Sequence, residues 1–179
     1  IKVKPFVPTL KKPAIDKLAW KIVKTSSGKG RDAIDGNMSS MWHSAHGDET
    51  PRHPHEIVID FGTTLSLDGF IQTARADMHN GVIKEYEVLV SEDGENWKSA
   101  VKSTFVYQAN KAEVRFKKKM DARYFKLIAL SEHKGGPWAT VAELDMIGGP
   151  SAKGKVQQKI QEVSRTIDRT ILTNFTDQS

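Results

Sequence analysis

Hydrophobic and polar residues alternate with a period of two along most of the chain. In the stretch 56–61, Ile57, Ile59 and Phe61 fall on one face and polar residues or Val on the other. A strand with one buried face produces this alternation, and clusters of Gly, Asp, Asn and Pro between such stretches mark turns. The pattern predicts an all-β fold, an antiparallel β-sandwich. The other alternating stretches are 82–90, 111–116, 123–129 and 142–146.

The two ends of the chain break this pattern. Residues 1–13 hold three Pro and four Lys without periodicity, which predicts a linker or lead-in. After Pro150, apolar residues recur at spacings of four, three, four and four, which is one face of a helix. We therefore divide the chain into 1–13, a folded domain at 14–149, and a helical tail or linker at 150–179. The apolar positions of the tail are Val156, Ile160, Val163, Ile167 and Ile171.

The partner of this apolar face is left open by the sequence. It could dock on the sandwich or on a neighbouring domain. Alternatively, the tail is a linker that is helical only in a longer protein, because isolated helices of this length are marginal in water.

Composition excludes several classes of protein. The chain has 179 residues, enough for one domain with extensions. Without Cys there is no disulfide framework and no Cys-ligated metal. No apolar run approaches the ~20 residues that span a bilayer, so we expect no membrane span. Because the first residue is Ile and no signal-peptide pattern precedes it, we interpret the chain as a mature or excised piece of a longer protein.

Charge and motifs also narrow the function. The net charge is +5, and several of the lysines lie near the N-terminus and at 117–119. Clustered lysines of this kind could bind a nucleic acid, but no aromatic residues are interleaved with them to contact its bases. Solvated lysines on loops and an edge strand explain them instead, so we expect no nucleic acid. The chain has no nucleophile elbow, phosphate loop or HExxH motif, and we predict that it is not an enzyme.

A set of short motifs occurs in an order that resembles the coagulation factor 5/8 type C (discoidin) domain. The resemblance covers about 15–149 and is closest to bacterial family 32 carbohydrate-binding modules and the N-terminal domain of galactose oxidase. The motifs are Ala33-Ile-Asp-Gly-Asn37, Trp42-His-Ser44, Pro54-His55, Ile59-Asp-Phe-Gly62, Tyr86-Glu-Val-Leu-Val-Ser91, Asp93-Gly94, Trp97, Ala122-Arg-Tyr-Phe-Lys-Leu127 and Ala142-Glu143.

This resemblance implies a jelly-roll sandwich of galactose-binding-like type. It further implies non-catalytic binding of galactose-type or related terminal sugars of glycans. Such a module accompanies a secreted, periplasmic or bacterial cell-surface glycosidase, and a covalently linked catalytic domain would lie upstream. Two rivals remain open: a protein- or lipid-binding adhesion domain with Met41, Met78 and Val82 at its rim, and an architectural domain of a larger enzyme.

The resemblance also implies a structural calcium ion. Ca²⁺ takes six to eight hard oxygen ligands, and Gly36 allows the first loop to curl so that its carbonyls converge. The alternative is a metal-free turn in which Asp35 accepts bonds from backbone amides. The implied ligands are the carbonyls of Asp32, Asn37 and Ala142, the carboxylates of Asp35 and Glu143, and the carbonyl and hydroxyl of Ser40.

The implied sugar site consists of His43, Arg75 and Asn80. An Arg donates a planar fork to two adjacent hydroxyls, and Asn and His complete the polar set. The family's usual aromatic residue after the His is His46 here, which departs from the pattern. Trp138 is the remaining platform for the sugar ring, although it could equally be a core residue.

Overall fold

The computed structural model describes residues 15–44 and 51–176. Strands dominate the described residues, and a single α-helix follows them, which confirms the predicted all-β fold with a helical tail. The elements are β1 (Lys21–Thr25), the 3₁₀ helix η1 (Gly30–Ala33), β2 (Trp42–His43), β3 (His55–Thr73), β4 (Glu85–Ser91), β5 (Lys98–Thr104), β6 (Lys111–Ala129), β7 (Thr140–Val141), β8 (Glu143–Pro150) and α1 (Ala152–Thr176).

Two long, bent strands build the sandwich. β3 and β6 pair antiparallel over almost their whole length, with register shifts between Asp60 and Leu65 and between Leu67 and Gly69. The first half of β3 also pairs with β1, and its second half pairs with β8. β4 joins β6, and β5 forms the edge beyond β4. The bends fold the two halves over one another, so 111–116 and 123–129 are one strand rather than two.

The core lies between these halves and is rich in aromatic side chains. Phe70 lies at its centre, with ring centroids 5.5 Å from Phe125 and 6.0 Å from Tyr86. Ile57, Ile59 and the predicted inward residues of 123–129 are buried, whereas Ala112 and Val114 of the stretch 111–116 are half-buried. Apolar burial of this extent is the main favourable term in folding, so the period-two pattern identified the core faces correctly.

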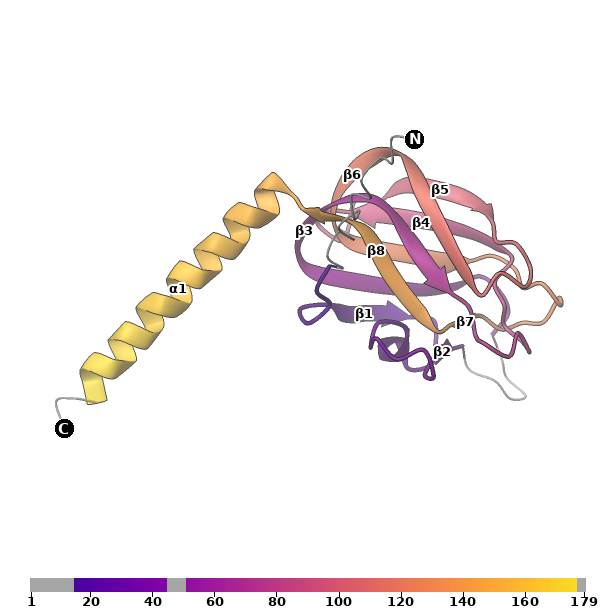
Figure 1. Ribbon diagram of the computed structural model, residues 1–179, viewed down its shortest axis with the longest axis horizontal. Helices are drawn as coiled ribbons and strands as arrows, with labels where there is room; N and C mark the ends of the chain where they lie inside the picture. The colour runs from indigo at the N-terminus through magenta and orange to yellow at the C-terminus, as the bar shows by residue number, and fades with distance from the viewer. Residues whose placement is uncertain (1–14, 45–50, 177–179) are drawn as a thin grey trace, which may run out of the picture.

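The bends also decide which loops meet. Because β3 turns back, its start at His55 and its end at Thr73 lie at the same end of the sandwich. The loops 74–84 and 130–139 and the pair β2–β7 gather there, and we call this end the rim. α1 begins at the opposite end and extends away from the sandwich (Figure 1). The rim is therefore free of α1.

Only the first turns of α1 are bonded to the sandwich in the described part of the chain. Ser151 donates its hydroxyl to the Thr64 carbonyl at 2.8 Å, and the Gln157 side chain accepts from the Thr64 N–H at 3.3 Å. Lys153 pairs with Glu92 at 2.8 Å. The hydropathy of α1 does not reach that of a bilayer-spanning helix, nor does any other described helix qualify. Of the apolar stripe of the tail, Val156, Ile160, Val163 and Ile167 are exposed rather than packed on the described sandwich.

Candidate functional site

Three of the predicted sugar-binding residues, His43, Arg75 and Asn80, meet at the rim. Arg75 follows the end of β3, His43 ends β2, and Asn80 lies in the loop 74–84. Arg75 Nη1 donates to both oxygens of Asn80, at 3.1 Å to the carbonyl and more closely to Oδ1. His43 Nε2 lies 3.4 Å from the same Oδ1. Since Oδ1 faces Arg75 and His43, the Asn80 amide Nδ2 is the group left to donate to a ligand.

Asp77 fixes the orientation of Arg75. Its carboxylate accepts from Arg75 Nε at 2.5 Å and from Nη2 at 2.9 Å, a two-point ion pair. It also accepts from the His79 N–H at 3.1 Å, which closes the turn between Arg75 and Asn80. The hydrogen bond from Arg75 holds the pKa of Asp77 at about 2. The guanidinium is therefore held in place at neutral pH without a ligand.

Glu132 joins the two loops of the rim and was not identified from the sequence. Its side chain is buried, although Glu is rarely buried without partners. One oxygen accepts from the Gly81 N–H at 2.9 Å and the other from the Gly136 N–H at 2.5 Å. The carboxylate thereby links the loop of Asn80 to the loop of Trp138. No local sequence pattern predicts this role of Glu132, because its two partners, Gly81 and Gly136, lie far from each other in the sequence.

Trp138 lies at the rim and is half-buried. Its burial is intermediate between that of a platform for the sugar ring and that of a core residue, the two roles that the sequence left open. Its ring lies against the backbone of Gly136, where a Cβ would approach the ring to 2.8 Å. The preceding Pro137 carbonyl accepts from His55 Nε2 at 2.5 Å, which anchors this loop to the start of β3. The other predicted aromatic replacement, His46, lies outside the described residues.

The first loop meets the start of the last strand, as the predicted calcium site requires. The Asp35 carboxylate accepts from the Asn37 N–H at 2.8 Å and from the Ser40 hydroxyl at 2.7 Å. The Gly36 N–H donates to Glu143 at 2.9 Å, across a separation of more than a hundred residues. Asp32 lies in η1 just before this loop, and Ala142 lies between β7 and β8. The hydrogen bonds thus join Asp35 to Asn37 and Ser40 and join Gly36 to Glu143, while Asp32 and Ala142 are near neighbours of these residues in the chain.

Lys17 supplies positive charge at this junction. Its ammonium pairs with Glu143 and, at 2.6 Å, with Asp145. Burial raises the pKa of Glu143 although Lys17 opposes the shift. For Asp35, burial is outweighed by hydrogen bonds from Ser40 and Asn37, and its pKa is lowered. The sequence did not identify Lys17 as a partner, since nothing in its local spacing points to Glu143.

The chemistry of this junction suits Ca²⁺ better than a softer metal. Its side-chain donors are oxygens of Asp35, Ser40 and Glu143, and hard oxygen ligands are what Ca²⁺ prefers. The described residues hold no cluster of three or more His, Cys, Asp or Glu side chains that could bind a metal. Backbone carbonyls would have to complete the shell, as the sequence implies. The hydrogen bonds within the loop equally match the metal-free turn.

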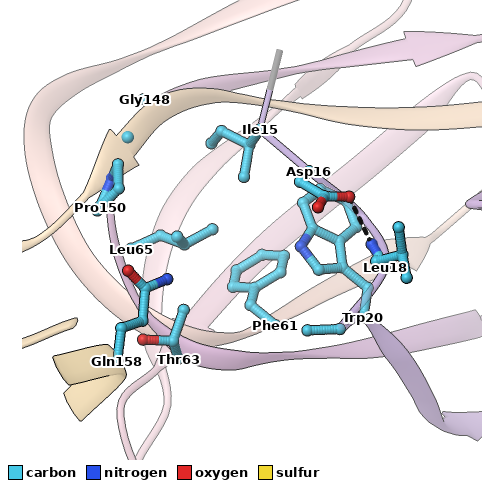
Figure 2. Close-up of a pocket in the computed structure, with 12 residues that line it drawn as sticks. Ile15, Asp16, Leu18, Trp20, Phe61, Thr63, Leu65, Gly148, Pro150 and Gln158 are labelled. Atoms are coloured by element: carbon cyan, nitrogen blue, oxygen red, sulfur yellow. Dashed lines mark hydrogen bonds between the residues drawn. The ribbon is translucent and has the colours of Figure 1, made fainter. Parts of the chain in front are cut away.

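A pocket lies at the end of the sandwich opposite the rim. Figure 2 shows this pocket between the bend of β3, the end of β8 and the start of α1, with the rings of Trp20 and Phe61 side by side. The two ring centroids are 4.9 Å apart. The cavity measures about 410 Å³, and Asp16, Thr63 and Gln158 are its main polar side chains. It lacks the Arg, Asn and His set of the rim.

Comparison with known proteins identifies the family. The family described as the F5/8 type C domain matches residues 19–144. The chain belongs to the F5/8 type C family. This F5/8 type C domain is 34% identical over 143 residues to a galactose oxidase of Gibberella zeae, covering 77% of the chain and 21% of that protein. It is 34% identical over 122 residues to a sialidase of Micromonospora viridifaciens, covering 68% of the chain and 19% of the sialidase. The chain thus spans about a fifth of the length of these relatives.

Solved structures agree with this assignment. A Clostridium perfringens family 32 carbohydrate-binding module in complex with GalNAc-β-1,3-galactose superposes with a TM-score of 0.70 at 26% identity, covering 76% of this chain and all of the module. The family 32 module of Clostridium perfringens NanJ, in complex with galactose, gives 0.66 at 25% identity, covering 74% of this chain and 96% of the module. The predicted resemblance to these modules is confirmed.

Proposed function

We propose that this F5/8 type C domain is a non-catalytic carbohydrate-binding module that recognises galactose-type terminal sugars of glycans. The observation that carries the proposal is the contact of His43, Arg75 and Asn80 at one end of the sandwich. Their side chains come from two segments far apart in the sequence, β2 and the loop 74–84, and they gather in a domain whose relatives include modules solved with galactose and with GalNAc-β-1,3-galactose.

The rim offers suitable partners for a pyranose. Arg75 is oriented by Asp77, and a pre-oriented donor loses less entropy when it binds a hydroxyl. The Asn80 amide can donate to a neighbouring hydroxyl, and the exposed part of the half-buried Trp138 can contact the apolar face of the ring. A single site of this kind gives weak affinity, because it buries few groups.

The lipid-binding alternative finds less support at the same place. Membrane insertion requires exposed apolar side chains at the loops. Val82 is buried, and Met41 and Met78 are half-buried. We therefore favour a glycan as the ligand, and a secreted or cell-surface protein with a linked glycosidase domain as the context. Tethering would raise the effective concentration of that glycosidase at its substrate.

Calorimetric titration with galactose tests the proposal. Arg75→Ala should weaken binding about tenfold or more, because a charge-assisted hydrogen-bond donor is lost. Arg115→Ala is the matched control, since Arg115 is exposed on β6 and pairs with Glu113; this variant should bind as the unmodified protein does. Absence of binding to galactose and related terminal sugars, or equal binding by Arg75→Ala, would contradict the proposal.

We further propose that the junction of the first loop with β8 holds a structural Ca²⁺. The proposal is supported by the approach of Asp35, Asn37 and Ser40 to one another and by the bond from Gly36 to Glu143. An ion at this point would tie the first loop to the last strand.

A further inference from the structure

The exposed apolar stripe of α1 has no partner on the sandwich. Val156, Ile160, Val163 and Ile167 are 59%, 63%, 52% and 53% exposed, and together we call them the α1 seam. Large apolar side chains in a row on one helix face are typical of a contact surface. Most helical stability in proteins comes from packing such a face. The described sandwich does not provide that packing.

We propose that the α1 seam binds the same seam of a second copy of this chain, in a parallel coiled coil. The seam residues are spaced four, three and four apart. This is the heptad spacing of positions a and d, with Ile160 and Ile167 at a and Val156 and Val163 at d. Ile at position a is what two-stranded parallel coiled coils favour, so the stripe suits another helix better than a flat surface.

Charge supports self-association. In an in-register parallel pair, the positions beside the seam are Gln157, Lys159, Ser164 and Thr166. Lys159 would face Ser164 of the second copy, so no like charges meet across the contact. The other charged residues between the first and last seam positions, Glu162 and Arg165, lie outside the contact. A basic or acidic partner would require charges beside the seam, and these are largely absent from positions 157–166.

The geometry of the chain favours the parallel orientation. Gly154 and Gln157 face the sandwich, with Gly154 so close that a Cβ would lie 2.1 Å from the Thr64 carbonyl oxygen. The seam lies on the other side of the helix, so two sandwiches could stand side by side. An antiparallel pair aligned over the same four residues would drive the end of each helix towards the sandwich of its partner, since α1 continues to Thr176. The rims would remain free at the far ends (Figure 1), and two glycan sites would act together.

Light scattering and sedimentation of the full chain test the assembly across about a hundredfold range of concentration. We expect the mass of the unmodified chain to rise from the monomer value of 20.0 kDa towards twice that value as the concentration rises. Ile160→Asp should return the mass to that of the monomer. The neighbouring Gln161→Asp, which places the same charge outside the seam, should assemble normally.

Cross-linking tests the orientation. The chain has no Cys, so Val156→Cys introduces a single thiol at a seam position. Oxidation should link equivalent residues of two copies in a parallel pair, whereas Gln161→Cys should stay unlinked. A monomer at every concentration, or an Ile160→Asp variant that keeps the assembly, would overturn the proposal. An assembled Val156→Cys variant that fails to cross-link would overturn the parallel arrangement.

Discussion

At the scale of single residues, the Glu132 carboxylate has the most consequences for the rim. Both of its oxygens accept backbone N–H groups, from Gly81 and Gly136, in a buried position. Removing an acceptor from a buried donor costs the full desolvation of that donor. Glu132 therefore holds together the loops that carry Asn80 and Trp138, as does Lys134 through its bond to the His79 carbonyl, which makes Glu132 a positioning residue.

Glu132→Ala should lower the free energy of unfolding by about 2 kcal/mol or more, because two buried N–H groups lose their acceptor. It should also weaken galactose binding by the folded protein. Glu132→Gln keeps one carbonyl acceptor and should recover part of both losses. Urea denaturation and calorimetry measure the two effects. Glu113→Ala, at an exposed position of β6, should change stability by no more than about 0.5 kcal/mol. Equal stability of Glu132→Ala and the unmodified domain would refute the role.

Protonation of His55 makes the stability of the folded domain depend on pH. Burial, opposed by the bond to the Pro137 carbonyl, lowers the pKa of His55 below its ordinary value of 6.5. The unfolded chain therefore takes up this proton at a higher pH than the folded chain does. Stability from His55 is fully present above pH 6.5 and declines as the pH falls towards the folded pKa. The decline is at most about 1.4 kcal/mol per pH unit for one proton.

Denaturation curves between about pH 7 and pH 5 should show this loss of stability. His55→Gln, which can still donate to the Pro137 carbonyl, should have a flatter profile over the same range. A variant profile as steep as that of the unmodified domain would show that other groups cause the pH dependence.

At the scale of elements, close backbone approach between β8 and β3 limits which residues β8 can contain. A Cβ on Gly148 would lie 2.2 Å from the Ser66 carbonyl oxygen, whereas a Cβ on the adjacent Gly149 would meet no heavy atom within 4 Å. The two strands pair directly at this point. The absence of a side chain at Gly148 thus permits the pairing that closes this part of the sandwich.

Gly148→Ala should destabilise the domain by about 2 kcal/mol, since overpacking a well-packed site costs 1–3 kcal/mol. Gly149→Ala should stay within about 0.5 kcal/mol of the unmodified domain. Thermal unfolding of the two neighbouring variants compares them directly. Similar stabilities would mean that β8 shifts without penalty.

The strands show which elements an alternating pattern predicts and which it misses. Strands with one buried face, such as 123–129, alternate strictly and were predicted correctly. β5 was missed because it is an edge strand with most of its residues exposed, so no alternation marks it. The continuity of β3 past residue 61 was missed because the strand changes its partners at a bend, where the alternation is interrupted.

At the scale of the whole molecule, the junction of the first loop with β8 closes the chain on itself. It joins residues near the start of the domain to residues near its end through the bond from Gly36 to Glu143 and the ion pair from Lys17 to Glu143. A ligand that binds only the folded state stabilises it by mass action. Calcium at this point would therefore act on the stability of the entire domain.

Added Ca²⁺ should raise the melting temperature, and a chelator should lower it. At about a hundred times Kd the stabilisation is about 2.7 kcal/mol. Asp35→Asn should remove the response, because it removes a charged ligand from the exposed first loop. Asp145→Asn should keep it, since Asp145 contacts Lys17 but lies outside the ligand set. A melting temperature that is unchanged by calcium and chelator would support the metal-free turn.

The sequence by itself determined the inward faces of the main strands and the apolar face of the helix, because side-chain direction follows the local period of a strand or a helix. The resemblance to the family indicated which residues would meet at the rim. Only the tertiary structure decided how they are held: Asp77 on Arg75, Glu132 between two loops, Lys17 on Glu143, and a helix that leaves the sandwich. Asp77 lies two residues from Arg75, but the contacts of Glu132 with Gly81 and of Lys17 with Glu143 join residues far apart in the sequence. Only the folding of the long strands brings such residues together, so no local pattern predicts these contacts.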